Sequence, residues 1–205
     1  MVTKCGKRPA SRFVIRELGR RTFPDWVRIA EKHDGVWGGC WCVTFHLSPG
    51  RSDRTAQSTG EPVPRSRREL KERLVRANRS HAALVYAGAD VVGWCQFGPP
   101  AELPGRMGGY GKLDVAPPDW RITCFFVDRD RRREGIAKAA LAGALRMIAA
   151  KGGGTVDGYP IATRGNYSSS FLWGGTESMF AEVGFRRVGQ LGTSKLVMRK
   201  RVRGR

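Results

Sequence analysis

The chain has 205 residues, and 40% of them are hydrophobic, which is enough apolar material for one core and predicts a single domain. Lys and Arg number 37 against 18 Asp and Glu, so the formal net charge is +19, which favours an anionic ligand such as nucleic acid or a phosphorylated cofactor. No apolar run is long enough to cross a bilayer, so we expect no membrane partner.

The ends of the chain and its cysteines suggest a cellular setting. Residues 1–12, MVTKCGKRPASR, carry charge but lack the apolar segment of a secretory signal. Five cysteines, an odd number, are typical of reduced thiols. We therefore expect a cytoplasmic protein in which a basic arm (1–11) precedes one domain (12–198) and a basic tail (199–205) follows it.

The first third of the chain predicts a strand, a helix and a cysteine-containing segment. Residues 12–18 alternate apolar and polar side chains, as a strand does. Thr22-Phe23-Pro24-Asp25 then predicts a helix start, with a capping hydroxyl, Pro in the first turn and an acid at the positive end. We expect this helix to stop near residues 34–35.

Residues 38–46 read GGCWCVTFH and raise the question of a zinc site. The spacing of Cys40, Cys42 and His46 argues against zinc, because structural sites favour C-x2–4-C and a second ligand pair. In a strand, Cys40 and Cys42 would point to one side and suit a core. The alternative is a pocket wall with a thiol or imidazole near the substrate; we expect no metal site.

Two long loops flank a helix and a hairpin. Residues 47–65 are polar and without periodicity, which predicts a loop inserted into the domain. Ser66 and Glu69 match a capping box that opens the next helix. Residues 81–86 and 91–97 predict an antiparallel hairpin, and the Pro- and Gly-rich residues 98–118 predict a second inserted loop that could line an acceptor site.

The stretch 122–141, ITCFFVDRDRRREGIAKAAL, organises the rest. An apolar strand ends at Val127, a basic turn follows, and Gly135 precedes a helix with one apolar face. A strand, a basic turn and a helix N-terminus together form an anion site. Further on, 155–159 predict a strand, Thr176 caps a short helix to residue 183, and 185–190 and 195–198 predict the last strands.

These motifs resemble the GCN5-related N-acetyltransferase (GNAT) superfamily. Its diphosphate loop, Arg/Gln-x-x-Gly-x-Gly/Ala, reads Arg-Arg-Glu-Gly-Ile-Ala at 132–137, and its Gly-Phe junction reads Glu-Val-Gly-Phe at 182–185. The resemblance implies an α/β (α+β) fold with a mixed, splayed central β-sheet flanked by helices, and acetyl-CoA as cosubstrate. It assigns acyl-CoA binding to Cys124, Phe125, Phe126, Val127, Arg132, Arg133, Glu134, Gly135, Ile136, Ala137 and Lys138. Arg133 stands where the family often has Gly.

The reaction implied is direct attack of a neutral amine on the thioester carbonyl. The family's usual proton donor to the leaving thiolate is a Tyr at the position of Phe180, which cannot donate. Tyr159, Tyr167 and Ser178 are the candidate catalytic donors instead, each with an alternative as a packing or capping residue. The base is open among Cys95, Gln96, Cys124, His46, His81, Glu102 and Asp114.

The acceptor also stays open. A small amine, a protein N-terminus or lysine, and an aminoacyl-tRNA all remain, whereas polycationic amines suit a basic protein poorly. A module that binds acyl-CoA or nucleic acid without chemistry is a different hypothesis, and Phe180 favours it. A homodimer is a further assembly that we consider.

Overall fold

The computed structural model of the chain describes residues 12–36, 38–47, 66–105, 107–162 and 169–205. The expected basic arm 1–11, nearly all of the loop 47–65 and the candidate donor Tyr167 lie outside these ranges. No helix among the described residues is long and apolar enough to span a bilayer.

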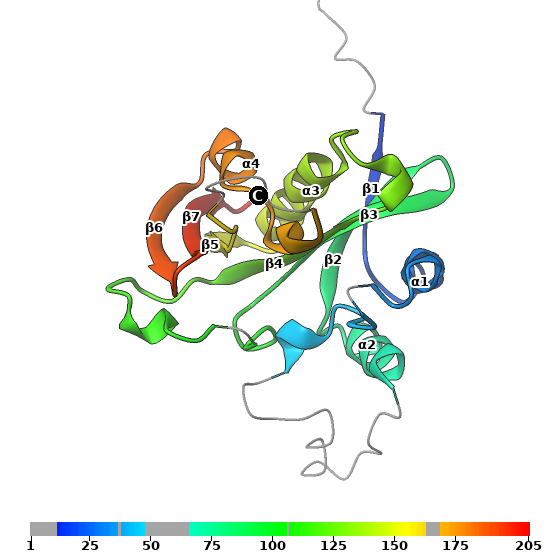
Figure 1. Ribbon diagram of the computed structural model, residues 1–205, viewed down its shortest axis with the longest axis horizontal. Coiled ribbons are helices and arrows are strands. Elements are labelled where there is room, and N and C mark those ends of the chain that lie inside the picture. The colour runs from blue at the N-terminus through cyan, green and yellow to red at the C-terminus, as the bar shows by residue number, and fades with distance from the viewer. Residues whose placement is uncertain (1–11, 37, 48–65, 106, 163–168) are drawn as a thin grey trace, which may run out of the picture.

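The described chain forms a seven-stranded mixed sheet with the strand order β1-β2-β3-β4-β5-β7-β6 (Figure 1). The strands are β1 (Val14–Glu17), β2 (His81–Ala87), β3 (Asp90–Gly98), β4 (Trp120–Val127), β5 (Gly153–Gly158), β6 (Arg186–Leu191) and β7 (Lys195–Arg203). The helices are α1 (Phe23–Lys32), α2 (Arg67–Arg76), α3 (Ile136–Ala150) and α4 (Glu177–Glu182). Short 3-10 helices are η1 (Thr44–His46), η3 (Tyr110–Lys112), η4 (Arg129–Arg131) and η5 (Ser169–Gly174).

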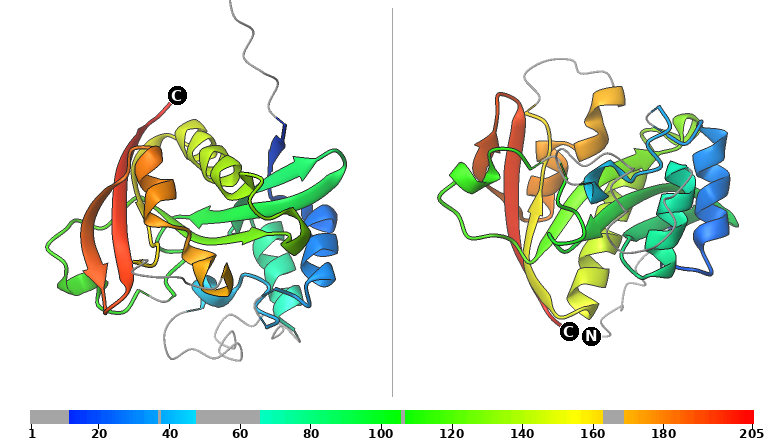
Figure 2. Two further views of the ribbon diagram at one scale, coloured as in Figure 1. Left: turned by 45° about the horizontal axis from the view of Figure 1, so that its top comes forward. Right: turned by 90° about the horizontal axis from the view of Figure 1, so that it is seen from below.

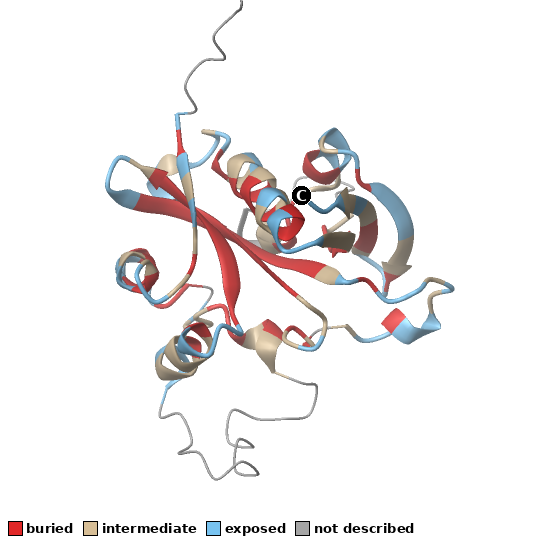
Figure 3. Ribbon diagram, turned by 180° about the vertical axis from the view of Figure 1, so that it is seen from behind, coloured by how far each residue is buried: buried red, intermediate tan, exposed pale blue. Residues whose placement is uncertain are grey.

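Helices cover both faces of the sheet, which explains the apolar character of its central strands. α3 and α4 lie on one face, and α1 and α2 lie on the other (Figure 1). The apolar side of α3 packs with Phe125 and Phe97 in one cluster, while Trp26 of α1 packs with Trp94 and Phe126 in a second. β2 and β3 are buried along most of their length (Figure 3), as strands covered on both faces must be.

The sheet opens between β4 and β5. These two strands are parallel and pair only at Trp120↔Val156, Arg121↔Asp157 and Ile122↔Gly158. Beyond that point β5, β7 and β6 turn away from β1–β4 (Figure 2). In the described part of the chain, residues 123–127 therefore keep β3 as a strand neighbour on one side and have none on the other. The β3–β4 register also shifts between Gln96 and Phe97, so Thr123 forms a bulge at this opening.

The segment 38–46 is not a strand, so the arrangement in which Cys40 and Cys42 would share one side does not occur. The segment is a series of turns followed by η1, and both Trp41 and Cys42 have a φ of +48°. Two successive left-handed residues cannot belong to a pleated strand. The core interpretation nevertheless holds for Cys42, which is 1% exposed, whereas Cys40 is only half-buried.

Two end-of-element predictions are also wrong. The last strand does not end at residue 198, because β7 continues to Arg203 and pairs with β5 from Met198 to Arg203. Arg199 therefore lies in the sheet, where its Nε is 2.8 Å from Oδ1 of the buried Asp157. The Thr22 hydroxyl does not cap α1; it donates to Glu17 O and accepts from Gly19 N. Ser66 and Thr176 do cap their helices, through Glu69 N and Met179 N.

Candidate functional site

A cleft of about 830 Å³ lies at the open edge of β4 and the N-terminus of α3. One wall comes from the stretch that the sequence singles out, and the opposite wall comes from η5 and α4. The lining residues are Phe125, Val127, Arg132, Arg133, Gly135, Ile136, Ala137, Lys138, Leu172, Gly175, Thr176 and Met179. Most of the predicted acyl-CoA residues are therefore brought together in one cavity.

Three of the predicted residues do not line the cleft. Side chains alternate along a strand, so Cys124 and Phe126 face the α1 side of the sheet while Phe125 and Val127 face the cleft. Their backbone groups still belong to the open edge of β4. Glu134 is held away by two guanidinium groups, since its oxygens are 2.7 Å from Arg131 Nε and 2.7 Å from Arg12 Nη2.

The turn before α3 exposes backbone rather than side chains. Gly135 is the N-cap of α3 with a φ of +81°, and no side chain caps this helix. The first N–H groups of a helix have no intrahelical partners, so those near Ile136–Lys138 are directed at the cleft with the positive end of the helix dipole. Arg133 also has a left-handed backbone, with a φ of +66°. Glycine adopts this conformation easily, whereas it costs an L residue such as Arg about 1–2 kcal/mol.

Basic side chains add charge to this end of the cleft. Arg132, Arg133 and Lys138 all line it. Lys138 also forms an ion pair with Glu182 of α4 at 2.6 Å, which connects the two walls. Backbone N–H groups, a helix N-terminus and basic side chains on one side are the features that a diphosphate needs.

The sequence predicts the helix that Thr176 caps, but it does not predict that this helix lines the cleft, and residues 162–175, which include η5, read as irregular. Leu172, Gly175, Thr176 and Met179 belong to the wall that η5 and α4 form. Gly175 has a φ of +79°, and a Cβ there would lie 2.6 Å from Met179 Cε and 3.2 Å from Phe125 Cε2. The pair of glycines directly before the helix cap at Thr176 was the available signal that the backbone passes close to β4.

The two candidate proton donors that the structure describes, Tyr159 and Ser178, are not in the cleft wall. Tyr159 is 1% exposed and packs edge-on against Tyr110 in a separate cluster, and burial raises the pKa of its hydroxyl well above the ordinary value. Ser178 is exposed, and its Oγ lies 3.2 Å from Thr176 Oγ1 at the start of α4. Neither residue is among the described residues that line the cleft.

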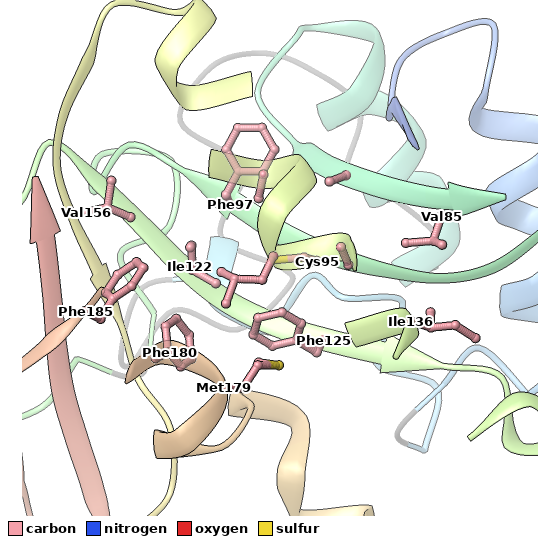
Figure 4. Packing of buried hydrophobic residues seen from close by; sticks show 14 of the residues in the cluster. Val85, Cys95, Phe97, Ile122, Phe125, Ile136, Val156, Met179, Phe180 and Phe185 are labelled. Carbon is pink, nitrogen blue, oxygen red and sulfur yellow. The ribbon is translucent and has the colours of Figure 1, made fainter. Parts of the chain in front are cut away.

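Phe180 is a core residue beside the opening of the sheet. It is fully buried and packs edge-on against Phe125 and Phe185, with ring centroids 6.0 and 5.0 Å away (Figure 4). Its ring edge also lies so close to Gly158 that a Cβ there would be 2.2 Å from Phe180 Cε1. The position therefore lies at the last β4–β5 pair but provides no proton.

The candidate bases form a buried network on the other face of the sheet. Burial lowers the pKa of His46 to about 3, so its imidazole is neutral. His46 Nδ1 lies 2.8 Å from Glu102 O and its Nε2 lies 2.9 Å from Gln96 Nε2, which fixes the proton on Nδ1. The Thr123 hydroxyl donates to Gln96 Oε1 at the bulge. This network orients β4 rather than supplying a strong base.

The other candidate bases are no better placed. Cys95 lies in the core on the α3 side, and burial raises its pKa well above the ordinary value. His81 lies between the carboxylates of Glu17 and Glu102, with each N–O distance at 3.3 Å. None of these groups lines the cleft, and over the described ranges no cluster of His, Cys, Asp or Glu could hold a metal ion.

Comparisons with solved structures support the fold. A GNAT-family protein of Desulfovibrio desulfuricans is 16% identical, with 93% of this chain and 99% of that chain covered and a TM-score of 0.51. A histone acetyltransferase HPA2 and related acetyltransferase of Corynebacterium glutamicum is 14% identical, with 92% and 95% covered and a TM-score of 0.52. An N-acetyltransferase of Staphylococcus aureus is 14% identical, with 93% and 99% covered and a TM-score of 0.51.

The sequence itself decides the family. No curated protein sequence matches the chain. The profile of the acetyltransferase (GNAT) family matches residues 51–157, which are 107 of the 205 residues and include the open strand β4 and the whole of α3. The chain is thus a member of the GNAT family of acetyltransferases.

Proposed function

We propose that this acetyltransferase takes its acetyl group from acetyl-CoA and transfers it to a primary amine by direct attack. The observation that carries the proposal is the single cleft that joins the open edge of β4 to the N-terminus of α3. An extended ligand with amides at one end and a diphosphate at the other matches that order of groups.

Each part of the cleft has a binding role in this proposal. Backbone N–H and C=O groups of residues 124–127 pair with the amides of the pantetheine arm, as a neighbouring strand would. Backbone N–H groups of Gly135–Lys138 donate to the diphosphate, and Arg132 and Arg133 supply positive charge. Apolar Leu172 and Met179 exclude water from the opposite side.

The acetyl carbonyl needs a donor, and the leaving thiolate needs stabilisation. A backbone N–H on the open edge of β4 provides the donor without any side chain. Phe180 cannot protonate the thiolate. A thiol with a pKa near 8.5 is nevertheless a better leaving group than an amine, so the thiolate departs without general-acid help. The chain's contribution is therefore mainly position and hydrogen bonding.

The attacking amine must be neutral, and the described residues that line the cleft include no carboxylate or imidazole that could act as a base. An imidazole with a pKa of about 3 is too weak to deprotonate an ammonium group, so His46 does not serve. We infer that the amine loses its proton to solvent. kcat/KM should then rise with pH up to the pKa of the acceptor amine, without an inflection near 6.5; an inflection near 6.5 would indicate a histidine base.

Thermal denaturation with ligands tests the cosubstrate. Acetyl-CoA at 100 times its Kd should stabilise the protein by about 2.7 kcal/mol, or roughly 5–10 °C in a domain of this size. Pantetheine alone, which lacks the diphosphate, should give a much smaller shift. Release of free thiol with a panel of amines then tests transfer. No shift with any acyl-CoA would refute the proposal.

Two alternatives have an observation behind them. The formal charge of +19 favours a protein- or tRNA-directed acetyltransferase, for which acceptor binding should weaken steeply as salt rises. Phe180 favours a silent acyl-CoA-binding module. A thermal shift with acetyl-CoA but no thiol release with small amines, peptides or aminoacyl-tRNA would establish that second alternative.

A further inference from the structure

A fully buried lysine lies on the side of the sheet away from the acyl-CoA cleft. Lys71 of α2 is 1% exposed, and its Nζ donates to Ser80 Oγ at 2.7 Å and lies 5.2 Å from the Trp26 ring centroid. Burial lowers the pKa of Lys71, and the described groups that oppose this shift are the thiols of Cys42, Cys124 and Cys40 rather than a carboxylate. An ammonium group buried without a counterion costs several kcal/mol, so a thiolate is the group that can balance it.

The donors around Cys42 identify which thiol carries the charge. Cys124 Sγ lies 3.7 Å from Cys42 Sγ, within reach of a hydrogen bond in which either sulfur can donate, and this contact lowers the pKa of Cys42. The nearby charge of Lys71 lowers the same pKa further, and so does the indole N–H of Trp94. The Trp94 N–H has no well-aligned hydrogen-bond partner in the described residues, so it is available to donate to a thiolate on Cys42.

Cys124 has the opposite environment. The hydrogen-bond contact with Cys42 and, after it, burial raise the pKa of Cys124 well above the ordinary value, so Cys124 is the neutral member of the pair. The two sulfurs come from residues 82 apart in the sequence, one in the turn segment 38–47 and one in β4. A thiolate in van der Waals contact with a thiol is the arrangement from which a disulfide forms.

We propose that Cys42 is a reactive thiolate and that a hydroperoxide converts Cys42 and Cys124 into a reversible disulfide. The Cys42 thiolate attacks the peroxide oxygen, which breaks the O–O bond and leaves a sulfenic acid on Cys42 and a hydroxide that takes a proton. Cys124 then gives up its own proton, and its sulfur attacks the Cys42 sulfur and expels water. Two thiols and one hydrogen peroxide yield one disulfide and two waters.

The bond requires a small movement with a defined consequence. An S–S bond is about 2.05 Å long, so the sulfurs must approach by roughly 1.7 Å from their 3.7 Å separation. The turn segment 38–47 would then be covalently attached to β4. Phe45 in that segment packs on Trp173 with centroids 5.6 Å apart, and the adjacent Leu172 lines the cleft. Oxidation would therefore link β4, on one side of the cleft, to the segment 38–47, which packs against η5 in the opposite wall.

Peptide mapping of the folded protein tests the proposal directly. Reduced protein is freed of reductant, treated with a few equivalents of hydrogen peroxide, alkylated and digested with chymotrypsin, which cuts at Trp41 and so separates Cys40 from Cys42. We expect a Cys42–Cys124 crosslink that dithiothreitol removes, while Cys95, which lies in the core on the other face, remains alkylated. Oxidation of Cys5 or Cys40 with Cys42 and Cys124 both left as thiols would overturn the proposal.

Matched variants separate the roles of the residues. Cys40→Ser should form the crosslink at the wild-type rate, and Cys42→Ser should not form it. Cys124→Ser should stop at a sulfenic acid on Cys42 that dimedone traps. Lys71→Met, with folding checked by circular dichroism, should slow the crosslink by roughly an order of magnitude, because the thiolate fraction of Cys42 falls when the nearby positive charge is removed. An unchanged rate of crosslinking in folded Lys71→Met would refute the inference that Lys71 stabilises a Cys42 thiolate. If this variant does not fold, the peptide map of the wild-type protein still shows whether the disulfide forms.

Discussion

Glutamate in place of Gly135 should remove most of the affinity for acetyl-CoA. Gly135 is the N-cap of α3, has a φ of +81°, and has no atom within 4 Å of the place where a Cβ would stand. Neighbouring atoms would therefore not exclude the new side chain. The two causes of a defect are the left-handed backbone and the added negative charge, and they can be separated.

The magnitude of each cause follows from general values. An L residue in the left-handed region costs about 1–2 kcal/mol, so both Gly135→Ala and Gly135→Glu should lose about that much unfolding free energy. Only Glu places a carboxylate beside the diphosphate, where like charges 4 Å apart repel by about 1 kcal/mol in water and about 4 kcal/mol near a protein surface. At 1.4 kcal/mol per factor of ten, the Kd should rise between about fivefold and a thousandfold.

Titration calorimetry with acetyl-CoA measures both variants against a control. Gly111→Glu adds the same charge at an exposed position of η3 with open space around it, outside the cleft. We expect wild-type affinity for Gly111→Glu, a small loss for Gly135→Ala and the large loss for Gly135→Glu. Equal affinity for the two Glu variants would refute the placement of the diphosphate at α3.

Three further variants test other parts of the structure. Phe180→Tyr should keep the fold and the transfer activity. Because it buries a hydroxyl, it should lower the unfolding free energy of the apo protein, measured by urea denaturation, by about 1–3 kcal/mol. A large loss of activity would instead place Phe180 in the acceptor pocket. Because the folded-state pKa of His46, about 3, lies below its unfolded value of 6.5, stability should fall as pH drops below 6.5. His46→Gln should remove up to about 1.4 kcal/mol per pH unit from the slope between pH 5 and 6, and an unchanged slope would contradict the buried neutral imidazole. Arg199→Met should cost about 3–5 kcal/mol, because it leaves the buried Asp157 without a cationic partner, and Arg201→Met on the same strand should cost under about 0.5 kcal/mol. Similar losses for both would contradict the buried pair.

The conformation of the turn before α3 could be predicted from the sequence because it depends on local features. A strand that ends at Val127, a basic turn and a glycine before an apolar helix face all lie within a short stretch. Backbone conformation at Gly135 and the helix dipole follow from that stretch alone. The same holds for the caps at Ser66 and Thr176, where one side chain satisfies a nearby N–H group.

The parts that could not be predicted depend on partners distant in sequence. Arg199 looks like a solvated tail residue until Asp157 of β5 is placed opposite it. Cys42 looks like a strand residue, since alternation alone does not show that the backbone at this point is left-handed. Leu172 and Met179 meet the cleft only because η5 and α4 fold back towards β4.

The opening between β4 and β5 divides the sheet into two parts that are joined by few hydrogen-bonded pairs. α3 packs against strands of both parts, with β1 to β4 in one part and β5 and β7 in the other, so it joins the two parts across the opening. About two turns from its first residue, Gly143 lets the helix approach Ile15 closely. A Cβ at Gly143 would lie 2.5 Å from Ile15 Cγ2, so a larger residue there should push α3 away from β1 and change how the helix joins the two parts of the sheet, although Gly143 is not among the described residues that line the cleft.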